Sequence, residues 1–236
     1  MPVCRVPWLE GFPDVVVHTT VGIRDAHADY AMAKAGAHGP AVRLSRDLTD
    51  AHAVDRIRTL LAGRKPLVVP VRAIEASGIN LIPDAMAHDL GRFLGLEVTT
   101  EIVQTNTVGH TRASGYHRLV HQPAFDGEVV KGGEYLAVDD PVGLGSTLAN
   151  LRGYLEAQGA RLIGATTMSA SRQSEVLALH AETLHGLKEK HGEALEQLWQ
   201  TALGFGLERL TEAEAGYLFR STSVDAIRAG MAAVRG

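Results

Sequence analysis

Two adjacent carboxylates precede a loop of glycines and hydroxyl residues near the middle of the chain. Asp139 and Asp140 come first, and the loop that follows them contains Gly143, Leu144, Gly145, Ser146 and Thr147. Carboxylates accept hydrogen bonds well from neighbouring hydroxyls, whereas glycine backbone and side-chain hydroxyls suit a phosphate. The order of these groups therefore indicates a site for a ribose 5-phosphate.

The flanking residues predict the elements that position these groups. The apolar run 135–138 lacks period-2 alternation, which is typical of a strand covered on both faces of a parallel sheet. A helix is expected from Ser146 or Thr147, because leucines recur at helical spacing at 148, 151 and 155 before Gly159. Since the first N–H groups of a helix lack intrahelical partners, this junction is suited to an anion.

Other phosphate motifs fit this stretch less well. A Walker A loop needs a lysine before its final hydroxyl residue, and a dinucleotide fingerprint needs a third glycine where Leu148 stands. The structural alternative is a strand end, a turn and a capped helix with solvated carboxylates. We favour the ribose-phosphate interpretation because its features are consecutive and mutually consistent.

The stretch YLAVDDPVGLGSTL resembles the signature of the type I phosphoribosyltransferases, which bind 5-phosphoribosyl 1-pyrophosphate (PRPP). The resemblance extends over about 66–170. It implies that Asp139 and Asp140 hold the ribose hydroxyls and that 143–147 hold the 5-phosphate. Gly143 and Leu144 depart from the family pattern, which usually has hydroxyl residues there.

The resemblance also assigns roles to two other loops. The loop after the strand 66–71 would cradle the pyrophosphate through Arg72, Ala73 and Ser77, although an ordinary strand-to-helix loop is the alternative for each side chain. The long connection before residue 135 corresponds to a loop that closes over PRPP. Arg112 is its preferred catalytic residue, and His110, His117 and Arg118 are further candidates. For His117 and His121 we prefer no metal, because no third ligand is evident.

The N-terminal segment 1–65 could form the hood that recognises the nucleobase acceptor in this family. His18, Tyr30 and Lys34 are its predicted acceptor-binding residues. The alternative is that Tyr30 and Lys34 form a surface pair and that His18 is a histidine at a strand end whose ring already has hydrogen-bond partners.

The predicted fold class is α/β: a phosphoribosyltransferase-like, mostly parallel twisted sheet flanked by helices. We expect strands at 14–19, 66–71, 97–104, 135–138 and 161–168. A core domain would cover 66–170. The segment 171–236 is predicted to be a helical extension that packs on the core or forms a dimer face.

The composition of the chain narrows the possible partners and the cellular location of the protein. The chain has 236 residues and a net charge of −4, with dispersed basic residues, which argues against a nucleic-acid partner. Cys4 is the only cysteine, and neither a signal peptide nor an apolar run of membrane-spanning length is present. We therefore expect a cytoplasmic protein without a membrane partner.

The function predicted from the resemblance is Mg²⁺-dependent transfer of phosphoribosyl from PRPP to an acceptor, with release of pyrophosphate. The acceptor is expected to be a nucleobase nitrogen and the protein a homodimer. Mg²⁺ would be held through PRPP near Asp139 and Asp140, without a direct protein ligand cluster. The alternative is a non-catalytic PRPP- or nucleotide-sensing regulator. A kinase-like phosphotransferase is disfavoured by the missing phosphate lysine.

Overall fold

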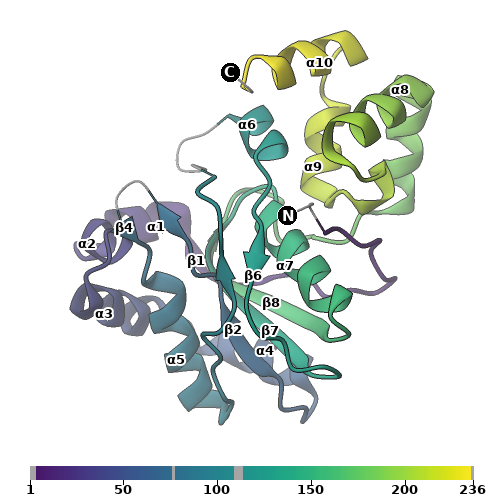
Figure 1. The fold of residues 1–236 in the computed structure, drawn as a ribbon. Coiled ribbons are helices and arrows are strands. Elements are labelled where there is room, and N and C mark those ends of the chain that lie inside the picture. The colour runs from purple at the N-terminus through teal and green to yellow at the C-terminus, as the bar shows by residue number, and fades with distance from the viewer. Residues whose placement is uncertain (1–3, 76–77, 109–113, 235–236) are drawn as a thin grey trace.

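The computed structural model describes residues 4–75, 78–108 and 114–234 and contains a central parallel sheet (Figure 1). The strand order is β1 (Val16–Thr20), β8 (Arg161–Ala170), β7 (Glu134–Val142) and β2 (Leu67–Pro70). Every neighbouring pair is parallel. A parallel bridge from Val68 to Val98 continues the sheet beyond β2. The predicted class, a mostly parallel sheet flanked by helices, is confirmed.

Helices cover both faces of this sheet. One face packs against α3 (His38–Leu48), α4 (Ala51–Leu61) and α5 (Ile82–Leu94) through Val68, Leu136 and Val138. The opposite face packs against α7 (Ser146–Ala157) through Val69, Tyr135 and Ala137. Alternate residues of the same strands thus enter separate cores, which explains why these strands read as continuous apolar runs.

Strand β7 is longer than predicted. It does not end at Val138 but continues to Val142, because Asp139, Pro141 and Val142 keep their register with Thr167, Ser169 and Ala170 of β8. Asp139 and Asp140 therefore lie inside a strand rather than after it. Consecutive strand residues point to opposite faces, so the two carboxylates diverge.

The predicted strand 97–104 is wrong in most of its length. Only the Val98 bridge and the short β5 (Val103–Gln104) are extended and paired, and β5 pairs with β6 (Phe125–Asp126) outside the main sheet. The connection before β7 also contains α6 (Gly115–Val120). The remaining short elements on the N-terminal side are α1 (Val21–Ala26), α2 (Tyr30–Lys34), β3 (Ile74–Glu75) and β4 (Gly78–Ile79).

The C-terminal part is helical, as predicted, and we call residues 181–232 the C-terminal helical unit. It comprises α8 (Ala181–Leu203), the 3₁₀ helix η1 (Leu207–Arg209), α9 (Glu212–Phe219) and α10 (Val224–Ala232). Helix α8 begins only at Ala181, and Gly192, with φ of 61°, kinks it. Thr211 forms a capping box at the start of α9, and the Ser223 side chain caps α10.

This unit has a hydrophobic core of its own. Leu187, Leu195, Trp199, Leu218 and Ile227 are buried together with Leu119 of α6. Figure 1 shows α6 grouped with the C-terminal helices at one end of the sheet. The unit therefore packs around α6 rather than over a sheet face.

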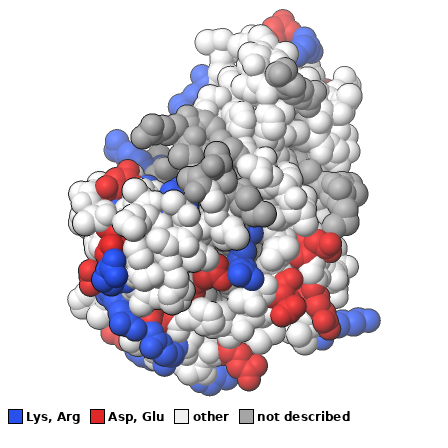
Figure 2. Space-filling model, turned by 60° about the vertical axis from the view of Figure 1, so that its left-hand side comes forward, with Lys and Arg blue, Asp and Glu red and all other residues white. Residues whose placement is uncertain are grey.

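The described surface carries charges of both signs. On the face in Figure 2, basic and acidic side chains are interspersed and do not form one continuous basic area. Among the described residues, no helix combines the length and apolar character that crossing a bilayer requires.

Candidate functional site

The sheet topology predicts a ligand-binding crevice between β2 and β7. The helix that follows β2, α5, lies on one face of the sheet, and the helix that follows β7, α7, lies on the other. In open α/β sheets such a switch point, at the carboxyl ends of the strands, is where ligands bind. The strand β2 ends at Pro70, which pairs with Val138, so 139–142 extend beyond it. This crevice is the candidate site.

Asp140 is wholly buried on the α5 side of β7, with 0% exposure. Its Oδ2 lies 3.1 Å from Nζ of Lys34 and accepts a hydrogen bond from Nδ2 of Asn80 at 3.3 Å. Its Oδ1 lies 3.6 Å from Nη1 of Arg24. Asp140 is thus the centre of a buried cluster with two cations.

Asp139 points to the other face of β7, toward α7, and is 9% exposed. Its Oδ1 accepts a 2.8 Å hydrogen bond from the backbone N–H of Asp140. The expectation of two carboxylates side by side on one sugar was based on a strand that ended before them. Because the strand continues, the two acids approach the crevice from different faces.

The predicted acceptor-binding residues Tyr30 and Lys34 lie in the cluster around Asp140. The Arg24 guanidinium stacks over the Tyr30 ring at 4.8 Å, and Nζ of Lys34 lies 5.8 Å from the same ring. Burial, and then the Asp140 charge, raise the pKa of Tyr30. Burial by itself would lower the pKa of Arg24, but Asp140, Asp25 and Tyr30 together outweigh it, and the net shift is upward. Sequence reasoning missed Arg24, whose only signal was its place in the loop after the first strand.

His18 has contacts that match a structural role. It is buried, its Nε2 lies 3.1 Å from Oγ1 of Thr166, and its Nδ1 accepts a 3.0 Å hydrogen bond from the backbone N–H of Asp50. Burial lowers its pKa to about 4, so the ring is neutral at pH 7. Both ring nitrogens are engaged, and His18 is therefore left out of the acceptor site proposed below.

The loop 143–147 leads into α7 with Gly145 as its N-cap residue. Gly145 has φ of 82°, a left-handed conformation that favours glycine. Ala149 donates the first backbone hydrogen bond of the helix to Gly145, so the N–H groups of 146–148 have no helical acceptor. Thr147 is half-buried in this first turn. The backbone therefore has the geometry of an anion site.

Ser146 and Leu144 of this loop contact the C-terminal helical unit. The Ser146 hydroxyl donates a 2.5 Å hydrogen bond to Oε1 of Glu214, and the Leu144 carbonyl accepts a hydrogen bond from the Thr211 hydroxyl. The Leu144 side chain packs against the hydrophobic core of that unit. The Ser146 hydroxyl therefore has Glu214 as its acceptor in this structure, and its contact with a phosphate stays a prediction.

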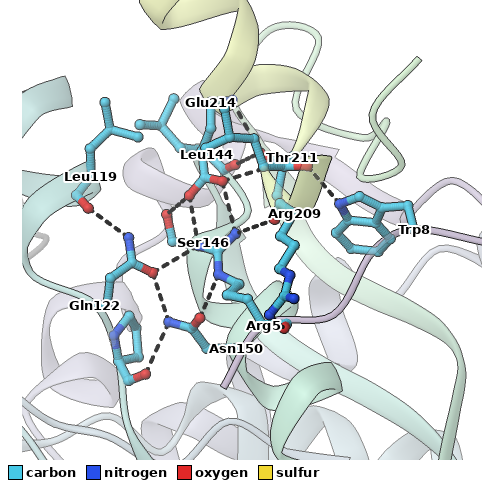
Figure 3. A network of polar contacts seen from close by, with 12 residues as sticks. Arg5, Trp8, Leu119, Gln122, Leu144, Ser146, Asn150, Arg209, Thr211 and Glu214 are labelled. Atoms are coloured by element: carbon cyan, nitrogen blue, oxygen red, sulfur yellow. Dashed lines mark hydrogen bonds and ion pairs between the residues drawn. The ribbon is translucent and has the colours of Figure 1, made fainter. Parts of the chain in front are cut away.

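A buried polar network stabilises this connection (Figure 3). Arg5 forms a bidentate ion pair with Glu214 at 2.8 and 2.9 Å, and both side chains are 0% exposed. Arg5 also donates to Asn150 of α7 at 2.5 Å and to Gln122 at 2.7 Å. Gln122 in turn donates to the carbonyl of Leu119 in α6 at 2.7 Å. The N-terminus, α6, α7 and α9 are therefore joined by one set of charged and polar contacts.

The loop after β2 contains the predicted pyrophosphate residues that can be described. Arg72 donates to the Thr100 carbonyl at 3.1 Å, and its Nε lies 3.1 Å from Oδ1 of Asp84 in the first turn of α5. Burial raises the pKa of Asp84, while Arg72 opposes that shift. Ala73 is half-buried, and its carbonyl accepts from the Asn80 backbone N–H at 3.4 Å. Ser77, His110 and Arg112 lie outside the described residues.

In the part of the chain that is described, no group of three or more His, Cys, Asp or Glu side chains could hold a metal ion. His117 and His121 stack with ring centroids 4.0 Å apart.

This chain is similar in sequence to two curated proteins and in structure to several solved enzymes. It is 42% identical over 231 residues to protein TraN of Escherichia coli, which covers 98% of this chain and 51% of TraN. It is 38% identical over 151 residues to an uncharacterized protein of Haemophilus influenzae, which covers 64% of this chain and 34% of that protein. The chain thus spans about half of the length of TraN and about a third of the length of the Haemophilus influenzae protein. No protein-family model matches it.

Solved phosphoribosyltransferases are among the structures that this chain resembles. An adenine phosphoribosyltransferase matches 56% of this chain and 75% of its own, with a TM-score of 0.38 and 15% identity. A hypoxanthine phosphoribosyltransferase of Staphylococcus aureus matches 53% and 64%, with a TM-score of 0.36 and 16% identity. The orotate enzyme of Mycobacterium tuberculosis matches 69% and 81%, with a TM-score of 0.34 and 18% identity. We draw no argument from similarities this low.

Proposed function

We propose that this protein binds PRPP in the crevice between β2 and β7 and transfers its phosphoribosyl group to an acceptor. The observation that carries the proposal is the glycine-containing turn at the start of α7, next to Asp139 and at the switch point of the sheet. Free N–H groups at a helix start suit a phosphate, and a carboxylate close by suits ribose hydroxyls.

In the proposed complex the backbone of 143–147 and the Thr147 hydroxyl hold the 5-phosphate. Asp139 accepts hydrogen bonds from the ribose, and Asp140 holds Lys34 and Tyr30 near the acceptor. Arg72 and Ala73 border the pyrophosphate, and Arg112 and Ser77 keep the roles predicted from the sequence. The bond from C1 to pyrophosphate breaks as the bond from C1 to an acceptor nitrogen forms. Positioning and charge stabilisation, rather than covalent catalysis, would lower the barrier.

The residues fit Mg²⁺ only in part. Asp139 has carboxylate oxygens, which are the ligands that Mg²⁺ prefers, whereas Asp140 is already committed to Arg24 and Lys34. Asp139 would therefore share a bound Mg²⁺ with PRPP oxygens, where the ion would neutralise pyrophosphate charge. A homodimer and a cytoplasmic location remain predictions.

The test is a pyrophosphate-release assay with PRPP, Mg²⁺ and a panel of purine and pyrimidine bases. We expect release with at least one base and its loss in Asp139→Asn. A protein that neither binds PRPP in calorimetry nor releases pyrophosphate would contradict the proposal.

A second candidate function is a non-catalytic PRPP or nucleotide sensor. The observation that favours it is the loop itself, in which Ser146 and Leu144 contact the C-terminal helical unit and leave fewer side-chain donors for a phosphate. Binding of PRPP without pyrophosphate release for every base would favour this function over transfer.

A further inference from the structure

Arg72 lies on the same side of the sheet as Asp140, at the carboxyl end of the neighbouring strand. Pro70 of β2 pairs with Val138 of β7. Arg72 and Asp140 each follow two residues later, and strand residues two apart point to the same face, which here is the face that α5 covers. The Val71 backbone N–H continues the pairing, with a 2.8 Å hydrogen bond to the Val138 carbonyl. Arg72 is therefore a cation at the switch point of the sheet.

Two contacts hold the guanidinium of Arg72. Its Nη1 donates a 3.1 Å hydrogen bond to the Thr100 carbonyl, and its Nε lies 3.1 Å from Oδ1 of Asp84. The Asp84 side chain is 13% exposed, whereas the Arg72 side chain is 34% exposed. The carboxylate therefore lies on the more buried side of the guanidinium. Among the described residues, Nη2 of Arg72 has no hydrogen-bond partner, so its two N–H groups remain for a ligand.

Asp84 occupies its position at a cost in stability. Its Oδ2 is buried and has no hydrogen-bond partner among the described residues. Burial raises the pKa of Asp84, although the charge of Arg72 opposes this shift. Buried polar atoms are normally paired, so an unpaired one in a crevice calls for a functional explanation. Holding Arg72 is such an explanation, because it needs only one oxygen of the carboxylate.

An arginine that is held in advance binds an anion at a lower entropic cost. A free arginine side chain loses rotamer freedom when it contacts a ligand, whereas Arg72 is already restrained by Asp84 and Thr100. The opposing effect is repulsion between the Asp84 carboxylate and the anion. The positive charge of Arg72, which lies on the more exposed side of that carboxylate, offsets this repulsion.

We propose that Asp84 is a positioning residue, which orients Arg72 so that Nη2 faces the pyrophosphate of PRPP. This inference rests on the proposed function, because it assumes that PRPP occupies the crevice. It adds a residue that the sequence did not indicate and that touches no substrate itself. Because Asp84 acts only through Arg72, its effect should be confined to ligands that carry the pyrophosphate.

The experiment compares binding of PRPP and of ribose 5-phosphate, each with Mg²⁺, by calorimetry. Ribose 5-phosphate lacks the pyrophosphate, so the ratio of the PRPP affinity to the ribose 5-phosphate affinity isolates that part of the ligand. In Asp84→Leu this ratio should fall about fivefold or more, because Arg72 regains its rotamer freedom. In Asp84→Asn most of the ratio should be retained, because the amide oxygen still accepts a hydrogen bond from Nε.

The matched control is Asp225→Leu. Asp225 is also an acid in the first turn of a helix and also pairs with an arginine, Arg228, but it is 86% exposed and belongs to α10. Both affinities should stay at the wild-type level in this variant.

A double-mutant cycle distinguishes positioning from a general structural effect. Arg72→Met should lower the same affinity ratio, and Asp84→Leu added to Arg72→Met should lower it no further, because Asp84 acts through Arg72. A general structural role of Asp84 would instead weaken both ligands together. Melting temperatures of all variants check that they remain folded.

The outcomes separate this inference from the proposed function. If the wild type fails to bind PRPP, the proposed function and this inference both fall. If the wild type binds PRPP and Asp84→Leu keeps the affinity ratio within about twofold or raises it, only the role of Asp84 is overturned. The same holds if the effects of Asp84→Leu and Arg72→Met simply add.

Discussion

The hydroxyl of Ser146, at the start of α7, donates a 2.5 Å hydrogen bond to Oε1 of Glu214 in α9. This contact joins the candidate phosphate loop to a helix almost seventy residues later in the chain. Because the same carboxylate pairs with Arg5, the loop, the N-terminus and the C-terminal helical unit depend on one buried ion pair.

Glu214→Gln should destabilise the protein. The change leaves the buried Arg5 without its counter-charge, and removing one partner of a buried pair costs about 3 kcal/mol or more. Urea unfolding would measure this loss. The control Glu182→Gln alters an exposed residue of α8 and should change the free energy of unfolding by less than about 0.5 kcal/mol. Equal stabilities of the two variants would contradict the importance of the network.

Asp140→Asn should destabilise the protein more than Asp139→Asn. Asp140 balances Lys34 and Arg24 in a wholly buried position, so its removal should cost about 3 kcal/mol. Asparagine at 139 can still accept the hydrogen bond from the backbone N–H of residue 140. Thermal unfolding would rank the stabilities of the two variants. A larger loss of stability for Asp139→Asn would contradict the stabilising role of the cluster around Asp140.

Asp139→Asn should impair ligand binding while the fold persists. The proposed ribose contact loses its negative charge, which should weaken binding of ribose 5-phosphate about tenfold. Calorimetry at pH 7 would measure it. Asp126→Asn, at an exposed position of β6, is the control and should bind normally. Unchanged affinity in Asp139→Asn would remove Asp139 from the site.

Stability should fall as the pH drops from about 6.5 to about 4, partly because of His18. Burial lowers its pKa to about 4, with Asp50 opposing and Arg56 adding to that shift. Above pH 6.5 the ring is neutral in both states, so its contribution is complete there. Below that pH the unfolded chain binds a proton that the folded protein does not bind, which lowers the free energy of unfolding by up to roughly 3 kcal/mol.

The measurement is the free energy of unfolding across that pH range for the wild type and His18→Gln. The variant should be less stable at pH 7, because two hydrogen bonds are altered, and its stability should fall less steeply toward pH 4. Parallel curves would mean that His18 titrates normally in the folded protein.

Gly145→Ala should cost more stability than Gly204→Ala. Both glycines lie in the left-handed region, with φ angles of 82° and 81°. A Cβ at 145 would lie 2.7 Å from Cδ2 of Leu177 and 3.1 Å from Cγ2 of Thr211, whereas a Cβ at 204 meets open space. We expect about 1 kcal/mol for Gly204→Ala and about 2 kcal/mol or more for Gly145→Ala. Denaturant titrations that give equal losses would show that the loop can shift away from α9.

Local sequence patterns are sufficient to predict those helices and turns whose formation depends on neighbouring residues. The apolar residues of helix α4 recur on one face and Asp50 caps its first turn, and both of these causes are local. The start of α7 followed from the glycines and leucines around it. The end of β7 was misplaced, because pairing of 139–142 with β8 depends on a strand that lies further along the chain.

The sequence by itself determined the α/β class, the glycine turn before α7 and the nearby carboxylates, because these depend on short-range periodicity, backbone freedom and side-chain chemistry. Only the tertiary structure decided which groups surround them. It brought Arg24 and Lys34 to Asp140, turned Ser146 toward Glu214 and placed Arg118 against Gly143. Such contacts join residues many positions apart, and they form because buried charges and apolar side chains must find partners when the separate cores pack together.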